Sequence, residues 1–330
     1  MIEKYRAPLA FLVMAFMLAI VGFGQSWSVA LSIINLCIIS AIMAIGVNLQ
    51  WGYAGLFNAG VMGFTALGGL TAVLVSHQPI YEAWSKAGNG ILISGFIVVL
   101  ATLGIYLCYK KIKKTLLKRI LIISIIGITL FGLNIFYGPS VSVIESINPA
   151  KTGFLGGLGL PIIVSWVVAA FVAGFVAWII GKITLGLRSD YLAIATLGIS
   201  EIVIAVLKYE DWLSRGVMNV TGLERPVPYE IDLQESTWFI DLIESINTTK
   251  LQTIIAVSER QDLLNSLVID GSSIFVKLCY VGLFIAVLLI IYFLSHLALQ
   301  SPWGRMLRAI RDNEDAASAM GKNIISQHLQ

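Results

Sequence analysis

The sequence predicts an all-α polytopic integral membrane protein, with about eight transmembrane helices, a broken glycine-rich element and short helices near the C-terminus. Hydrophobic residues make up 58% of the 330 residues and charged residues 12%, against roughly 45–50% and 25% in soluble domains. Residues 7–81 contain no Asp, Glu, Lys or Arg. A soluble domain could not cover so much apolar surface with polar side chains.

Eight stretches are apolar over about the 20 residues that a helix needs to cross a bilayer. The predicted spans are Pro8–Gly24, Val29–Leu49, Gly60–Val75, Ile91–Tyr109, Ile120–Tyr137, Pro161–Gly181, Tyr191–Leu207 and Ile274–Leu299. The first span follows Lys4 and Arg6, as the apolar part of a signal peptide would. No small-residue cleavage site follows it, and a second uncharged span comes at once, so we expect an uncleaved helix.

Lys and Arg in the short loops predict that both ends of the chain lie inside. The inner segments are then 1–7, 50–59, 110–119, 182–190 and 300–330. They contain 14 Lys and Arg residues, whereas the short outer loops contain only Lys86 and Lys151. Four regions follow: a core of spans one to seven (1–207), an external loop (208–272), span eight (273–300) and an inner C-terminal segment (301–330).

The external loop 208–272 is acidic, with 11 Asp and Glu against 5 Lys and Arg. Long loops cross the membrane largely regardless of charge. The apolar positions of Leu233–Ile246 predict an amphipathic helix along the outer surface. This helix is either a cap over the bundle or a docking surface for an external partner.

A glycine-rich, uncharged stretch joins the second and third spans. It reads Asn48-Leu-Gln-Trp-Gly-Tyr-Ala-Gly-Leu-Phe-Asn-Ala-Gly60. Backbone that leaves a helix at membrane depth is tolerated where it is buried in protein or lines a cavity, and such breaks build substrate paths in transporters. The four-residue spacing of Gly55, Ala59 and Gly63 equally fits close helix packing. The sequence leaves both interpretations open.

Glu201 is the one carboxylate well inside a predicted span. It lies 11 residues after Asp190, about 16 Å along a helix, which is close to mid-membrane. A charge at that depth costs at least roughly 2.5–3.5 kcal/mol. Glu201 is therefore a functional candidate, and a protonated structural glutamate bonded to a neighbouring helix is the alternative.

The C-terminal segment carries the signals of two short helices. Ser301 can cap the first helix and Pro302 can begin it. Its basic residues form one stripe: Arg305, Arg308 and Arg311. Asp312 or Asn313 can cap the second helix, which Gly321 would end. Its small residues, which let a partner approach closely, are Ala316, Ala317 and Ala319.

Other classes of site find no support. The three cysteines lie in separate apolar stretches without Cys-x-x-Cys spacing, and the three histidines are far apart, so we expect no metal site. The net charge of +3 is too small to indicate nucleic-acid binding.

Three ordered motifs carry a family resemblance. Asp315-Ala-Ala-x-x-x-Gly321 resembles the EAA…G coupling loop of ABC importer permeases, with Asp where Glu is usual. With the preceding residues from Gly304, it resembles the permeases of branched-chain amino acid transporters, in particular the LivM-like branch. Residues 52–60 resemble that family's GYAGxxSxG element, with Asn58 where Ser often stands. Residues 187–202 resemble its LRGDYLAIxTLGxxEI element, and residues 219–222 resemble the NGLTG stretch that follows.

The resemblance implies roles for particular residues. Contacts with an ATPase would fall on Gly304, Arg305, Arg308, Arg311, Glu314, Asp315, Ala316, Ala317 and Gly321. The translocation path would draw on Gly52, Tyr53, Gly55, Asn58, Gly60, Asp190, Tyr191, Thr196 and Glu201.

The resemblance also implies an assembly. No Gly-x-x-x-x-Gly-Lys-Ser/Thr loop occurs in the chain, so ATP and Mg²⁺ would be bound by two separate ATPase subunits and no cofactor by this chain. A second homologous permease subunit, an external substrate-binding protein and an aliphatic, branched-chain amino acid would complete the importer. Its location would be the cytoplasmic (inner) membrane of a bacterium. Family members continue with further membrane helices, so we expect the chain to be C-terminally incomplete.

Three other functions compete with this one. A permease for urea or another small amide or polar solute differs only in substrate. A stand-alone secondary transporter predicts several mid-membrane charges or an internal repeat, and the sequence shows neither. An intramembrane enzyme needs paired acids, or a histidine with a nucleophile, at membrane depth. We therefore expect a transport subunit and not an enzyme.

Overall fold

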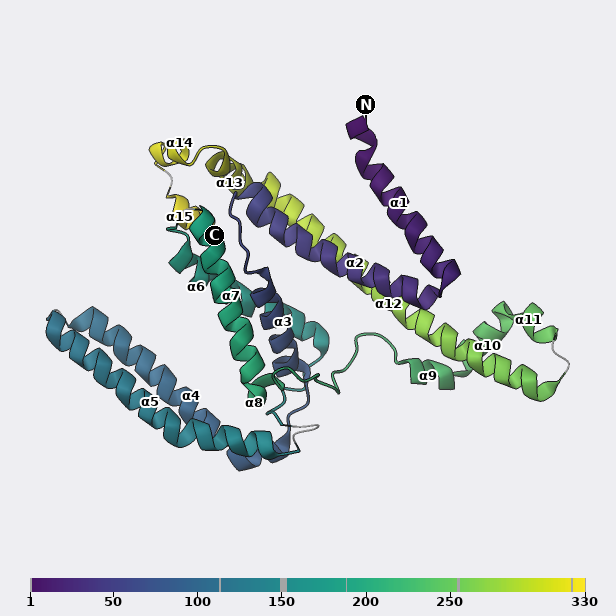
Figure 1. Ribbon diagram of the computed structural model, residues 1–330, viewed down its shortest axis with the longest axis horizontal. Helices are drawn as coiled ribbons and strands as arrows, with labels where there is room; N and C mark the ends of the chain where they lie inside the picture. Colours follow the sequence, from purple (N-terminus) through teal and green to yellow (C-terminus); the bar gives the residue numbers. More distant parts are fainter. Residues whose placement is uncertain are drawn as a thin grey trace. The chain divides into compact units, whose positions relative to one another are not determined.

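The computed structural model describes residues 2–112, 114–148, 153–187, 189–253, 256–321 and 323–329. In these residues every regular element is a helix, which confirms the predicted all-α class (Figure 1). The chain divides into two compact units. The first consists of Met1–Asn58 and Arg225–Gln330, and the second of Ala59–Glu224.

All eight predicted spans have a helical counterpart. Six helices among the described residues are long and apolar enough to cross a membrane, and the apolar helices Pro8–Gly24 and Val61–Ser76 are shorter. Large apolar side chains point outwards: Phe171 is 77% exposed, Ile128 71% and Phe131 70%. Such surfaces are costly in water and expected against lipid tails. The chain is a multi-pass membrane protein.

The first unit is built on α2 (Trp27–Val47) and α12 (Val257–Gln300), which run side by side (Figure 1). Its other membrane-type elements are α1 (Ile2–Gly24) and the π-helix η1 (Asn48–Tyr53). Lys277 on α12 donates to the backbone oxygen of Ser28 on α2 at 3.1 Å, and the hydroxyls of Ser28 and Ser273 lie 3.1 Å apart. These polar contacts join the first turn of α2 to α12.

Helix α12 is much longer than the apolar run that predicted it. It begins at Val257 rather than at Ile274 and has 44 residues, about 66 Å at 1.5 Å per residue. The hydrocarbon core of a bilayer is only about 30 Å thick, so part of α12 extends beyond it. Residues 257–272, the last part of the predicted loop 208–272, are helical because α12 begins at Val257.

Three short helices pack along this extension: α9 (Glu230–Glu235), α10 (Thr237–Ile246) and α11 (Thr248–Gln252). The single amphipathic helix predicted over Leu233–Ile246 is wrong in this respect, because Ser236 has an extended backbone and separates α9 from α10. The shared core contains Val227, Leu233, Phe239, Val268 and Val276.

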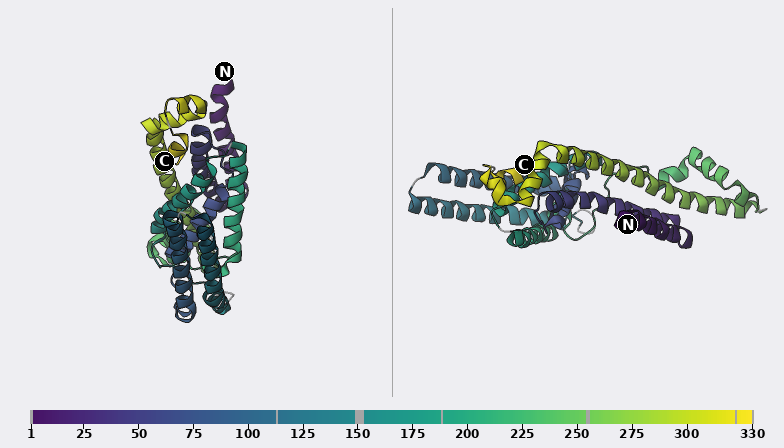
Figure 2. Two further views of the ribbon diagram at one scale, coloured as in Figure 1. Left: turned by 90° about the vertical axis from the view of Figure 1, so that its left-hand side faces the viewer. Right: turned by 90° about the horizontal axis from the view of Figure 1, so that it is seen from above.

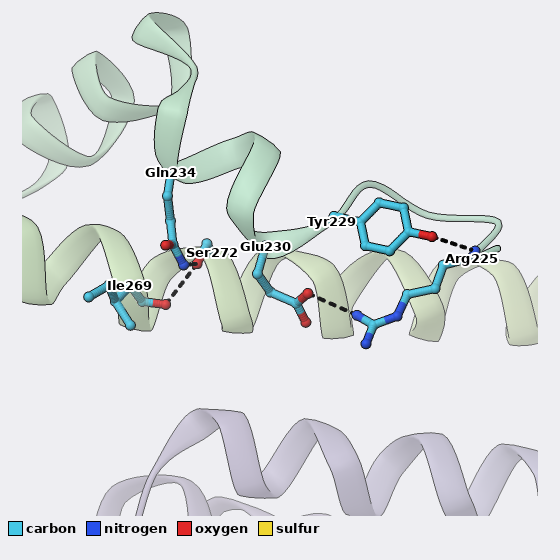
Figure 3. Close-up of polar contacts among 6 residues, drawn as sticks. All are labelled: Arg225, Tyr229, Glu230, Gln234, Ile269 and Ser272. Atoms are coloured by element: carbon cyan, nitrogen blue, oxygen red, sulfur yellow. Dashed lines mark hydrogen bonds and ion pairs between the residues drawn. The ribbon is translucent and has the colours of Figure 1, made fainter. Parts of the chain in front are cut away.

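Polar contacts reinforce this packing (Figure 3). Gln234 donates to the hydroxyl of Ser272 at 2.9 Å. Arg225 pairs with Glu230 at 2.8 Å in the segment that leads into α9. The helices α9 and α10 thus pack against α12, and the cap and the docking surface both stay predictions.

The second unit contains α3 (Val61–Ser76), α4 (Tyr81–Lys111), α5 (Thr115–Ser146), α6 (Ile162–Thr184), α7 (Ser189–Tyr209) and α8 (Asp211–Ser214). Helices α4 and α5 form a long hairpin, side by side in each view (Figures 1 and 2). The buried apolar residues at its base are Ala83, Ala87, Ile144, Ile147 and Leu155.

A glycine-rich segment, residues 153–161, fixes the C-terminal end of α3. The amide of Leu158 donates to the carbonyl of Leu74 at 3.0 Å, and that of Leu160 to the carbonyl of Val75 at 2.9 Å. Gly156 has φ +77°, and a Cβ there would lie 2.4 Å from the carbonyl oxygen of Gln78. Only glycine fits this approach, and the contact holds α3 in place at the end opposite Gly60.

Candidate functional site: the glycine-rich break and the C-terminal helices

The predicted break between the second and third spans is present. Helix α2 passes into the π-helix η1, and the chain then runs without regular structure until α3 begins at Val61. Short π-helices occur frequently at functional sites. Gly55 has φ +75°, in the left-handed region that glycine adopts without penalty. At Gly52 a Cβ would lie 2.2 Å from Oδ1 of Asn48.

Side chains of α7 hold the far end of this segment. The hydroxyl of Thr196 accepts from the amide of Ala59 at 3.2 Å, and that of Ser200 accepts from the amide of Gly63 at 2.8 Å. The amides at the start of a helix have no partner within the helix, so α7 supplies acceptors at the start of α3. Thr196 and Ser200 are buried.

A recess lies at the same place, within the second unit. Its empty volume is about 240 Å³, including space open to the outside. Its lining residues are Gly60, Gly63, Phe64, Leu67, Ile180, Thr196, Ile199, Ser200 and Val203. Both interpretations of the small residues find support: a Cβ on Gly63 would lie 2.8 Å from Oγ of Ser200, as in close packing, and Gly60 lines the recess.

The predicted path residues divide between the two units. Gly60 and Thr196 line the recess in the second unit, and Gly52, Tyr53, Gly55 and Asn58 belong to the first unit. Helix α7 buries Leu192, Thr196 and Ser200 and exposes two further path candidates, Tyr191 and Glu201. These two residues therefore lie on a different side of α7 from Thr196. The side chain of Asp190 lies outside the described residues.

Thr196→Val should release the amide of Ala59. Valine keeps the size of threonine but removes the acceptor, and an unpaired amide in a half-buried position costs about 1–3 kcal/mol. We expect faster hydrogen exchange in the peptide covering Ala59. The matched control is Thr71→Val, because the hydroxyl of Thr71 donates to the carbonyl of Leu67 within α3. Unchanged exchange at Ala59 in Thr196→Val would refute this anchoring role.

The two predicted C-terminal helices are present, with the predicted caps. They are α13 (Pro302–Asp312) and α14 (Glu314–Ala319). Ser301 accepts from the amide of Gly304 at 3.5 Å, and Asn313 accepts from the amide of Ala316 at 2.9 Å. Gly321 follows α14 with φ +79°, the left-handed backbone typical after a helix end.

The arginine stripe makes contacts that the sequence did not indicate. Arg305 donates to the carbonyl of Gln300 at 2.9 Å, and Arg308 to that of Leu299 at 3.3 Å. Both cover carbonyls at the C-terminal end of α12, where cations are favourable. Arg311 instead donates to the carbonyl of Gly52 in η1, 259 positions away in the sequence. The C-terminal helices therefore contact the glycine-rich break within the first unit.

Helix α14 presents an open surface. Glu314, Asp315 and Ala316 are exposed, and Ala317 is half-buried. Met320, directly after the helix, is 83% exposed. The adjoining helix α15 (Ile324–His328) contacts α13 and α14. There, burial lowers the pKa of His328 and the nearby carboxylate of Glu314 opposes this shift.

Comparisons with known proteins give one match. The family model described as branched-chain amino acid transport system / permease component matches residues 89–326, more than two thirds of the chain. The matched residues include α7 and the C-terminal helices α13 and α14, whereas the glycine-rich stretch 48–60 precedes them. Comparison with curated proteins and with solved structures gave no match.

Proposed function

The chain belongs to the permease component family of branched-chain amino acid transport systems, a family of transport components and not of enzymes, and we propose that it is the membrane-spanning subunit of an ATP-driven importer. ATP and Mg²⁺ bind to two separate ATPase subunits in this proposal. A second homologous permease subunit and an external substrate-binding protein complete the assembly.

The observation that carries the proposal is the open surface of α14. A six-residue helix of small and acidic residues is exposed on one side, and α13 connects it to the end of α12 and to η1. Small side chains let a partner's backbone approach closely. In our proposal an ATPase cleft closes around α14, and the movement of this helix passes through α13 into the membrane part as a rigid-body motion.

The proposed orientation puts the N-terminus and α13–α14 in the cytoplasm of a bacterium, with its inner membrane as the location. The distribution of Lys and Arg supports this orientation. Residues 208–272 then lie outside, where the substrate-binding protein docks. Glu201 is exposed on α7. The sequence predicts that it lies near mid-membrane depth, where an exposed carboxylate is costly against lipid. We assign Glu201 to the face that the second permease subunit covers.

We propose an aliphatic amino acid as the substrate, and the apolar lining of the recess supports this choice. Five of its lining side chains are apolar: Phe64, Leu67, Ile180, Ile199 and Val203. Urea carries no alkyl group that such a lining could contact, whereas a leucine or valine side chain gains free energy for each apolar group removed from water. Thr196 and Ser200 supply hydroxyls at the same place. We propose that the translocation path passes this recess beside Gly60.

Proteoliposomes that contain the chain, both ATPases, the second permease and the substrate-binding protein should accumulate labelled leucine only with ATP. Unlabelled leucine should compete and urea should not. Uptake without ATP would favour a stand-alone transporter. Competition by urea and not by leucine would indicate urea or a related amide as the substrate.

Glu201→Gln distinguishes a role of this carboxylate in the translocation path from a structural role. Because Glu201 does not line the recess, leucine uptake should stay within about twofold of wild type, a change of less than ~0.5 kcal/mol. A loss of about tenfold or more, equivalent to ~1.4 kcal/mol, would return Glu201 to the translocation path.

A further inference from the structure

The carbonyl of Gly52 lies near the end of a helix that stops inside the glycine-rich break. Gly52 is the second-last residue of η1, which ends at Tyr53. Carbonyls in the last turn of a helix lack partners within it and favour a cation. The guanidinium of Arg311 takes this place, with Nη1 donating to the Gly52 oxygen.

The other donors of Arg311 fix the direction of its side chain. Nε and Nη2 donate to the same carboxylate oxygen of Asp312 at 3.1 and 2.8 Å. This pair leaves Nη1 for Gly52, and a charged donor makes a stronger hydrogen bond than a neutral one. The aliphatic part of Arg311 lies close to Gly55. A Cβ added to Gly55 would lie 2.8 Å from Cγ of Arg311.

The backbone that carries Arg311 is itself held firmly. Leu307 and Ile310 on α13 are each 3% exposed, and α13 contacts both α12 and η1. Asn313, two residues after Arg311, caps α14. Arg311 lies at the end of α13 next to α14, so a movement of α14 reaches it directly across Asp312 and Asn313.

We propose that Arg311 is the positioning residue that transmits movement of α14 to the glycine-rich break. The hydrogen bond to Gly52 and the contact with Gly55 make the break follow α13. This role rests on the proposed function, because the driving movement comes from an ATPase gripping α14. Arg305 lies on the same helix, and its side chain donates to the carbonyl of Gln300 at the end of α12, which makes Arg305→Gln the matched control for the hydrogen-exchange test.

The first test uses the full chain without ATPases, so it does not depend on the proposed function. In nanodiscs, Arg311→Gln should speed hydrogen exchange in peptides covering Gly52–Phe57 by about tenfold, the equivalent of ~1.4 kcal/mol. Arg311→Lys should restore part of the protection, and Arg305→Gln should leave it unchanged. Equal exchange in Arg311→Gln and wild type would overturn the proposal.

The second test uses the assembled transporter and needs no knowledge of the substrate. Phe57→Cys, at a position 41% exposed, is labelled with a thiol reagent before and after trapping the ATPases with ATP and vanadate. Trapping should change the labelling rate in this background. In Arg311→Gln the change should disappear while ATP hydrolysis continues. A persisting change in Arg311→Gln would overturn the transmission role, whereas failure of the wild-type chain to bind ATPases would overturn the proposed function itself.

Discussion

Replacing Gly55 with valine should abolish transport while the membrane helices still form. Gly55 has φ +75°, and a residue with a side chain loses about 1–2 kcal/mol in this backbone region. A β-branched residue is a still poorer fit there. The new Cβ would also lie 2.8 Å from Cγ of Arg311, so the side chain that contacts the break must move away.

The measurement is ATP-dependent leucine uptake, together with circular dichroism to confirm helix content. The control is Gly69→Val in α3, where a Cβ would meet nothing within 4 Å. We expect this control to retain uptake. Wild-type uptake by Gly55→Val would contradict the account of the break.

Replacing Gly304 with alanine should separate α13 from α12. A Cβ on Gly304 would lie 2.4 Å from the carbonyl oxygen of Leu299 and 2.5 Å from its Cα. These are backbone atoms of the preceding helix, so no side chain can rotate to relieve the clash. Overpacking of this kind costs typically about 1–3 kcal/mol, and more where the backbone must shift. The burial of Leu307 and Ile310 would be lost with the displacement.

Thermal unfolding in detergent and hydrogen exchange over α13 check this prediction. Gly304→Ala should lower the unfolding temperature and expose α13 to exchange. The matched variant is Gly282→Ala within α12, where a Cβ would meet nothing within 4 Å and alanine favours the helix by about 1 kcal/mol. Equal stability of the two variants would contradict the prediction that the close approach of Gly304 to the backbone of Leu299 holds α13 against α12.

The features that the sequence predicted correctly depend on local signals. The spans follow from apolar runs, whose length is set by the bilayer. Ser301, Asn313 and Gly321 mark helix ends because each satisfies backbone groups within a few residues of itself. The glycine-rich break was predictable from a local signal too, because an uncharged stretch rich in glycine between two spans indicates that the helix is interrupted there.

What the sequence did not predict depends on contacts between distant segments. Nothing in the stripe of arginines distinguishes Arg311 from Arg305, yet only Arg311 reaches Gly52. The start of α12 at Val257 was missed because residues 257–272 are too polar for a membrane span, and packing against α9 and α10 holds them helical. The side of α7 that Glu201 occupies likewise depends on which face packs against α3.

In the proposed importer, an ATPase binds the open surface of α14. A cysteine cross-link from Ala317→Cys tests this contact, in a chain whose three free cysteines, Cys37, Cys108 and Cys279, have been replaced by serine. We expect a cross-linked product with the ATPase subunit that strengthens on ATP binding, and modification of this cysteine by thiol reagents applied to the cytoplasmic side. Labelling only from the outside, or no cross-link in an assembled complex, would contradict it.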